Sequence, residues 1–190
     1  MGTLVLGSGS PRRYDLLNMA GFAFTTRTAA IDEYVNPDEQ PQQTVCRLAD
    51  EKSDAIPLNE HEVLLTADTL VVYEGHALGK PKDRHDAFAM IEKLNGQTHT
   101  VMTAVTIRDN WEKHQLMVTT EVDFHSFSKT DIHRYIERGD YQDKAGGYGI
   151  QSLGALLVEG IRGDYYNVVG LPLSRVVLEL RAFGIHPEFE

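Results

Sequence analysis

The hydrophobic pattern of the chain has two periods, which together predict a mixed α/β protein. Segments with the continuous or alternating apolar pattern of strands are residues 4–6, 22–31, 63–67, 70–73, 76–78, 98–108, 114–127, 156–161 and 165–169. The short pair 70–73 and 76–78 flanks Glu74-Gly75 and predicts a hairpin. The two long segments, 98–108 and 114–127, are separated by a polar loop, and we expect them to pair antiparallel.

Apolar residues at helical spacing predict helices between these strands, over residues 11–20, 42–56, 87–94, 129–138 and from Pro172 onward. We expect the side chain of Ser10 to cap the first helix, and Pro11 suits the first helical position. Ser128 and Asp131 form a variant of the capping box. No internal repeat interrupts these elements, and the length fits a single domain over residues 1–190.

Residues 143–151 break both periods. They place three glycines within four residues and have no amphipathic pattern. Glycines interleaved with Asp, Lys, Tyr and Gln are typical of a loop that approaches a ligand closely, although flexibility alone is an alternative explanation.

Charge and composition narrow the class of protein. The formal net charge of -10 argues against a nucleic-acid-binding module or a protein of anionic membrane surfaces, because such binding rests on a positive face. Any anionic ligand must therefore be held by a local cluster of cations. No long apolar run or basic leader occurs, so we expect a soluble, cytoplasmic protein. The single cysteine, Cys46, excludes an internal disulfide and a thiolate zinc site.

The first candidate site is residues 7–13, which read as a turn of small residues opening a helix. Arg12 and Arg13 follow the helix start, where each cation is unfavourable by roughly 0.3–1 kcal/mol if exposed. An anion would offset them, and free amides with two guanidinium groups are typical of a phosphate site. The alternative is an ordinary capped helix with two solvated arginines.

The second candidate site is Asp68, which directly follows the buried strand 63–67. A carboxylate there is costly unless it is paired, hydrogen-bonded or metal-bound, and open α/β folds bind ligands at strand ends. The alternative is an Asp that caps a turn. Lys52 lies on the buried stripe of helix 42–56, either as a ligand for an anion or with its ammonium group reaching water.

Several common sites are absent from the sequence: the dinucleotide-binding glycine fingerprint, the nucleotide P-loop, the serine-hydrolase elbow and the zinc helix. Cations and carboxylates remain. Those that could neutralise a polyphosphate are Arg12, Arg13, Lys52 and Lys80, and those that could hold a magnesium-type ion are Asp68 and Glu33. This combination indicates phosphoryl or nucleotidyl chemistry.

Seven short motifs, spread over nearly the whole chain, carry these residues and the glycine-rich loop. They are Ser8-Gly9-Ser10-Pro11-Arg12-Arg13, Leu48-Ala49 with Lys52, Ala67-Asp68-Thr69, Gly79-Lys80-Pro81, Thr103-Ala104-Val105, Asp143-Lys144-Ala145-Gly146 through Gln151, and Val168-Val169-Gly170-Leu171-Pro172. Together, and in this order, they closely resemble the Maf family of nucleoside triphosphate pyrophosphatases. Gly147 and Ser152 stand where many members of that family have Ala and Gly.

The resemblance implies an α/β fold with a long, twisted mixed sheet flanked by helices, with two lobes and a central cleft, as in the inosine triphosphate pyrophosphatases. It implies a homodimer that hydrolyses a nucleoside triphosphate to the monophosphate and pyrophosphate with Mg²⁺ or Mn²⁺. Ala-Asp-Thr and Gly-Ile-Gln look like the dTTP/UTP branch, which extends to modified pyrimidine nucleotides. The alternatives are a 7-methyl-GTP pyrophosphatase and a nucleotide-binding regulator of septum formation.

The resemblance also implies roles for individual residues. Asp68 would be the proton acceptor that activates water, and it would share a metal ion with Glu33, for which Asp32 is the alternative. The residues that would bind the triphosphate are Ser8, Ser10, Arg13, Lys52 and Lys80. The positions linked to base selection are Arg12, Thr69 and Gln151; for Gln151 the alternative is an amide that bonds its own loop.

Overall fold

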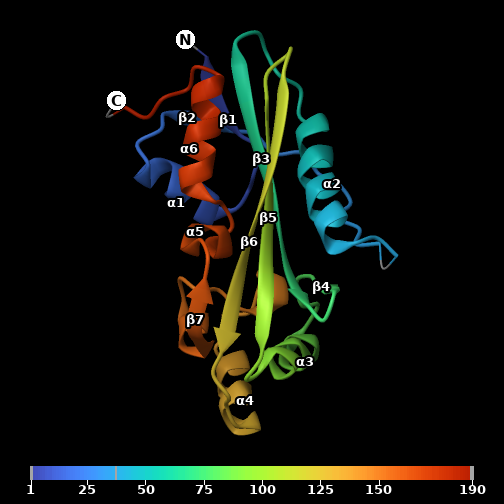
Figure 1. Cartoon of the computed structure of the whole chain (residues 1–190). Coiled ribbons are helices and arrows are strands. Elements are labelled where there is room, and N and C mark those ends of the chain that lie inside the picture. The colour runs from blue at the N-terminus through green and yellow to red at the C-terminus, as the bar shows by residue number, and fades with distance from the viewer. Residues whose placement is uncertain (1, 37, 189–190) are drawn as a thin grey trace.

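The computed structural model describes residues 2–36 and 38–188 and shows one mixed sheet flanked by helices (Figure 1). The described strands are β1 (Thr3–Leu6), β2 (Phe24–Thr26), β3 (Glu62–Tyr73), β4 (His76–Leu78), β5 (Thr98–Arg108), β6 (Lys113–Phe124) and β7 (Val158–Arg162). Within the described residues they form a seven-stranded sheet in the order β2-β1-β3-β5-β6-β7, with β4 paired to β3. β1 is parallel to β2 and β3, and the remaining pairs are antiparallel. The predicted long mixed sheet is therefore confirmed.

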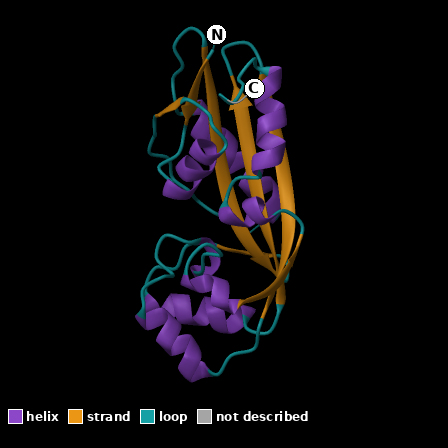
Figure 2. Ribbon diagram, turned by 90° about the vertical axis from the view of Figure 1, so that its left-hand side faces the viewer, coloured by secondary structure: helices purple, strands orange, loops and turns teal. Residues whose placement is uncertain are grey.

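Helices cover both faces of this sheet. The described helices are α1 (Pro11–Met19), α2 (Pro41–Asp54), α3 (Arg84–Leu94), α4 (Lys129–Glu137), α5 (Tyr165–Val169) and α6 (Leu173–Ala182), with the 3₁₀ turns η1 (Ala145–Gly147) and η2 (Leu153–Leu157). α1 and α6 share one hydrophobic cluster, whereas α3 and α4 share a second one. Figure 2 shows the helices gathered in two groups along the sheet. α2 lies across the sheet from α1 and α6 (Figure 1).

β3 runs through the middle of the sheet as one strand. The sequence predicted two strands, 63–67 and 70–73, with a break at Asp68-Thr69, and this prediction is wrong. β3 pairs with β5 without interruption from Leu64 to Val72. Asp68 and Thr69 are tolerated inside the strand because Lys52 bonds the carboxylate and a neighbouring hydroxyl bonds the threonine.

Residues 165–169 form α5 rather than the predicted strand. Asp164 is the reason, because its side chain accepts hydrogen bonds from the backbone N–H groups of Tyr166 and Asn167 and so caps the helix. The apolar run Val168-Val169 favoured a strand in the sequence, but the cap three residues earlier decides the local structure.

Two other predicted strands are displaced or shorter. β2 ends at Thr26 instead of running toward Ile31, because its neighbour β1 ends at Leu6 and offers no further partner. The predicted strand 156–161 begins later, as β7, because η2 takes up the residues before Val158. The predicted hairpins β3–β4 and β5–β6 and the Ser128 cap of α4 are confirmed.

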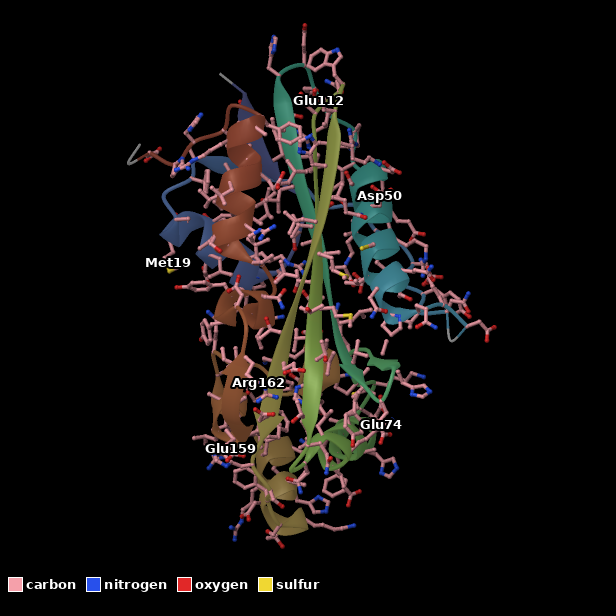
Figure 3. All side chains as sticks on the ribbon, viewed as in Figure 1. Met19, Asp50, Glu74, Glu112, Glu159 and Arg162 are labelled. Carbon is pink, nitrogen blue, oxygen red and sulfur yellow. The ribbon has the colours of Figure 1, made fainter. Side chains whose placement is uncertain are left out.

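Acidic side chains are distributed over both ends of the molecule. Figure 3 labels Asp50 on α2 and Glu112 at the β5–β6 turn toward one end, and Glu74 and Glu159 toward the other.

Among the described helices, none has the length and apolar character needed to cross a membrane. The predicted single domain of residues 1–190 stays a prediction, and residues 1, 37 and 189–190 lie outside the described part.

Candidate active site

A cavity of about 680 Å³ lies between segments from the two ends of the sheet. It is lined by residues 7–13 and 28–31 from one end and by residues 143–145 and 148–151 from the other. All of the site residues predicted from the sequence line it, namely Ser8, Ser10, Arg12, Arg13, Glu33, Lys52, Asp68, Thr69, Lys80 and Gln151. The fold therefore brings together residues that the sequence separates by more than a hundred positions.

The cavity opens where one edge of β3 has no strand beside it. β1 pairs with β3 up to Leu65, and β4 begins to pair at Val71. Gly7 makes the departure of β1 possible, since a Cβ there would lie 2.6 Å from the side chain of Thr66. Among the described strands, none pairs with residues 66–70 at this edge of β3, and of these residues Asp68 and Thr69 line the cavity.

On the α2 side of β3, two carboxylates and two ammonium groups form a chain of ion pairs. Nζ of Lys52 lies 2.5 Å from Oδ1 of Asp68 and 2.8 Å from Oε1 of Glu33. Nζ of Lys80 lies 3.2 Å from Oε2 of Glu33. The side chains of Lys52 and Asp68 are only 15% and 10% exposed, so this charge pair is largely removed from water.

The surroundings of Lys52 and Glu33 bear on two alternatives from the sequence. Lys52 is bonded to carboxylates, so the interpretation of a lysine whose ammonium simply reaches water is wrong. Glu33 lines the cavity, whereas Asp32 is not among its lining residues. Burial raises the pKa of Glu33, but the hydrogen bonds and charges of Lys52 and Lys80 outweigh burial and leave this pKa below its ordinary value. Glu33 is therefore an anion at neutral pH.

On the opposite side of β3, Arg13 is almost completely buried and spreads its donors over three partners. Its Nε donates to the carbonyl oxygen of Gly170 (2.8 Å), Nη1 to Oγ of Ser8 (3.2 Å) and Nη2 to Oγ1 of Thr69 (3.1 Å). Burial lowers the pKa of Arg13, but a guanidinium stays protonated in proteins. The site thus contains a fixed positive charge at the start of α1.

The turn before α1 differs from its prediction in one respect. Ser10 occupies the cap position and Pro11 the first helical position, but the Ser10 side chain makes no capping hydrogen bond, so that part of the prediction is wrong. The backbone N–H of Ser10 donates instead to Oγ of Ser8, 3.2 Å away. The Ser8 hydroxyl therefore holds both the turn and Arg13. Arg12 reaches across the cavity, with Nη2 3.5 Å from the carbonyl oxygen of Asp143.

The glycine-rich loop packs directly against β3. A Cβ at Gly146, whose φ is +68°, would lie 2.9 Å from the side chain of Val71, so this position requires glycine for both conformation and space. The backbone N–H of Gly146 donates to the carbonyl oxygen of Gly79, which ties the loop to the segment carrying Lys80. Gln151, the last predicted residue of this loop, lines the cavity with an exposed side chain.

The family of this chain follows from a comparison with known proteins. A family model described as "Maf-like protein" matches residues 3–183. The chain belongs to the Maf family. Three similar relatives are each called "dTTP/UTP pyrophosphatase": those of Bacillus pumilus (44% identical; 98% of this chain and 100% of the relative covered), Syntrophomonas wolfei (47%; 90% and 92%) and Halalkalibacterium halodurans (43%; 100% and 100%).

Among solved structures, a nucleoside-triphosphatase (dITP/XTP pyrophosphatase) of Mycobacterium abscessus covers 94% of this Maf chain and 94% of its own, with 9% identity and a TM-score of 0.43. A similarity of this size carries no argument about function.

The Maf chain also has cavity residues to which the sequence assigned no role. Gly170 supplies the carbonyl oxygen that holds Arg13, and Lys144 lines the cavity while its ammonium group bonds the backbone oxygen of Asp140. Both lie inside motifs recognised in the sequence. The contact of Gly170 could not be read there, because it depends on how the end of α5 folds back onto Arg13, whereas the contact of Lys144 depends on the local turn over residues 140–144.

Proposed function

We propose that this Maf chain hydrolyses dTTP and UTP to the monophosphate and pyrophosphate, with modified pyrimidine nucleotides as further substrates. The similarity to relatives named dTTP/UTP pyrophosphatase over nearly their full length supports the reaction and the branch. The observation that carries the proposal is the pairing of a buried carboxylate, Asp68, with Lys52 beside further cations in one cavity. A triphosphate needs these two kinds of group, a base for water and a positive clamp for its oxygens.

In the proposed reaction Asp68 accepts a proton from water. The hydrogen bond from Lys52 engages Oδ1, so Oδ2 is the oxygen that would face the water. The water oxygen bonds to the α-phosphorus while the bond from this phosphorus to the bridging oxygen breaks. The electron pair of that bond leaves with pyrophosphate. Lys52, which donates to Oδ1, would hold the carboxylate in place beside the water.

The cations around the cavity would hold the triphosphate. In this proposal Lys52, Lys80 and Arg13 bind phosphate oxygens, and the turn containing Ser8 and Ser10 offers hydroxyl and amide donors. Arg13 is the most rigid of these cations, because three protein oxygens already fix its orientation. A fixed cation costs little reorganisation when negative charge develops in the transition state.

Mg²⁺ or Mn²⁺ is part of the proposal, and the donor set fits it. Among the described residues no group of three or more His, Cys, Asp and Glu gathers as a complete metal cage. Asp68 and Glu33, however, converge on one ammonium group, and two carboxylates suit an ion that completes its shell with water and phosphate oxygens. When bound, the ion would neutralise phosphate charge. We also propose a homodimer, on the resemblance to the Maf family, and a cytoplasmic location, on the lack of a long apolar run in the sequence.

The test is a nucleotide panel. Pyrophosphate release from dTTP, UTP, CTP, GTP and 7-methyl-GTP is measured with Mg²⁺ for wild type, Asp68→Asn and Asp15→Asn. Asp15 is an exposed carboxylate on α1 outside the cavity, so its variant is the matched control. We expect turnover of dTTP and UTP by wild type and Asp15→Asn and its near-complete loss in Asp68→Asn. Wild type without turnover would refute the activity, an active Asp68→Asn would refute the mechanism, and a preference for 7-methyl-GTP would assign the other branch.

A further inference from the structure

Two threonines connect Arg13 to α5 through a continuous chain of hydrogen bonds. Thr69 on β3 and Thr103 on β5 lie directly opposite each other in the sheet, and their Oγ1 atoms are 2.9 Å apart. On one side, Nη2 of Arg13 lies 3.1 Å from Oγ1 of Thr69. On the other side, Oγ1 of Thr103 lies 3.0 Å from the backbone oxygen of Asn167. Thr103 and Asn167 are fully buried.

The direction of every hydrogen bond in this chain follows from counting hydrogens. A carbonyl oxygen only accepts, so the single hydroxyl hydrogen of Thr103 points to Asn167. Thr69 must then supply the hydrogen between the two hydroxyl groups, and its oxygen accepts from the guanidinium of Arg13, which only donates. The donors therefore follow one order, from Arg13 to Thr69, from Thr69 to Thr103 and from Thr103 to Asn167. We call these three hydrogen bonds the relay.

The far end of the relay is itself fixed. Nδ2 of Asn167 donates to the backbone oxygen of Val101 (3.1 Å) and to Oγ1 of Thr120 (3.0 Å), which holds α5 against β5 and β6. Three residues later, the carbonyl oxygen of Gly170 accepts from Nε of Arg13. The guanidinium is thus held twice, once directly by Gly170 at the end of α5 and once by Asn167 within α5 through the two threonines.

We propose that Thr103 is a positioning residue that fixes the guanidinium of Arg13 through the hydroxyl group of Thr69. The proposal rests on the pyrophosphatase activity proposed above. Its reason is that Thr103 is fully buried and is not among the residues that line the cavity, so its hydroxyl group can act on a substrate only through Thr69 and Arg13. Loss of the Thr103 hydroxyl group should affect every nucleotide equally, because Arg13 would contact the phosphates that all of them share.

The experiment compares Thr69→Val and Thr103→Val, which remove one hydroxyl each at nearly constant volume, with Thr69→Ser and Thr103→Ser, which keep it. kcat and KM are measured for the nucleotide panel, and circular dichroism verifies folding. We expect Thr103→Val to lower kcat/KM by roughly threefold to tenfold on all nucleotides, the size of one lost hydrogen bond, and Thr69→Val to lower it by at least as much. Both serine variants should retain most of the activity. The double valine variant should lose little beyond the worse single variant, because both substitutions break one chain.

Several results would overturn the proposal: wild-type kinetics or a changed ranking among nucleotides in Thr103→Val, serine variants as impaired as valine variants, or losses that multiply in the double variant. If Thr103→Val does not fold, Thr103→Ala removes the same hydroxyl with a smaller side chain and takes the same comparison. A wild-type protein that releases no pyrophosphate refutes the activity and the positioning role together, whereas an active wild type with unaffected variants refutes the positioning role alone.

Discussion

The ion pair between Lys52 and Asp68 gives the sharpest test of how charge is arranged in this site. Lys52→Met keeps the length and apolar stem of the side chain but removes the ammonium group. Glu33, which is 43% exposed, keeps Lys80 as a partner and remains accessible to water. Asp68, only 10% exposed, loses its cation. One largely buried carboxylate is left uncompensated, for which the expected cost is about 3 kcal/mol of unfolding free energy.

The assay is urea denaturation at pH 7, with a thermal scan as a second measure. A loss of about 3 kcal/mol corresponds to a fall in Tm of roughly 6–12 °C for a chain of this size. Lys113→Met is the matched control, because Lys113 also bonds two carboxylates, Asp50 and Asp54, but with 38% of its side chain exposed. Exposed pairs of this kind contribute below about 1 kcal/mol each.

A second variant separates charge from packing. Lys52→Met/Asp68→Asn removes the uncompensated carboxylate, so it should recover most of the stability that Lys52→Met loses. If Lys52→Met is as stable as Lys113→Met, the ion pair between Lys52 and Asp68 contributes no more than an exposed pair. If the double variant recovers no stability, the loss in Lys52→Met comes from the packing of the lysine stem. Either result would refute the electrostatic account.

Three further predictions concern other residues of the cavity and the glycine-rich loop beside it. Arg13→Ala should lower kcat/KM on every nucleotide whereas Arg12→Ala should change the ranking among them, and equal losses across the panel for both would contradict this division. Gly146→Ala should destabilise the fold by roughly 1–3 kcal/mol in urea denaturation, because its backbone is in the left-handed region and the new Cβ meets Val71. The pKa of Glu33 is lower in the folded protein than its ordinary value of 4.5, so the charge of Glu33 stabilises the fold above pH 4.5. This contribution is lost as the pH falls through the lower pKa of the folded state. The difference in unfolding free energy between wild type and Glu33→Gln should therefore be full at pH 7 and shrink below about pH 4.5, and a difference that stays constant with pH would contradict the prediction.

The sequence predicted that Lys52, Asp68 and Arg13 lie close together, because each is a charged residue at a position where the neighbouring sequence makes a charge unfavourable. Lys52 stands on an apolar stripe, Asp68 interrupts an apolar run, and Arg13 opposes a helix dipole. In the structure each of these features is a residue of the same cavity. An unexplained charge in a segment of clear periodicity was thus a reliable signal of the site, although it did not say which partner the charge would find.

The local structure of the polar residues was harder to predict. Asp68-Thr69 looked like the end of a strand because apolar pattern was the only evidence, whereas the ladder with β5 continues through both residues. α5 was predicted as a strand because a five-residue segment is too short to show a helical period, and only the cap Asp164 marks it. Thr103 looked like an ordinary strand residue, because its role depends on the cross-strand neighbour that the register supplies.

Because β3 is uninterrupted, one cavity can combine the carboxylate of Asp68 with the guanidinium of Arg13. Successive residues of a strand point to opposite faces of the sheet, so Asp68 meets Lys52 on α2 while Thr69 meets Arg13 on α1, across the sheet from α2 (Figure 1). Both could line one cavity only at an edge where no strand separates the two faces, and β3 has such an edge between the partners β1 and β4. A strand ending at residue 67 would have left the two side chains to a loop, with neither the ladder to β5 nor the alternation to fix them. The continuity of β3 is therefore what sets the candidate base and the arginine anchor at a fixed spacing, on either side of the same free edge.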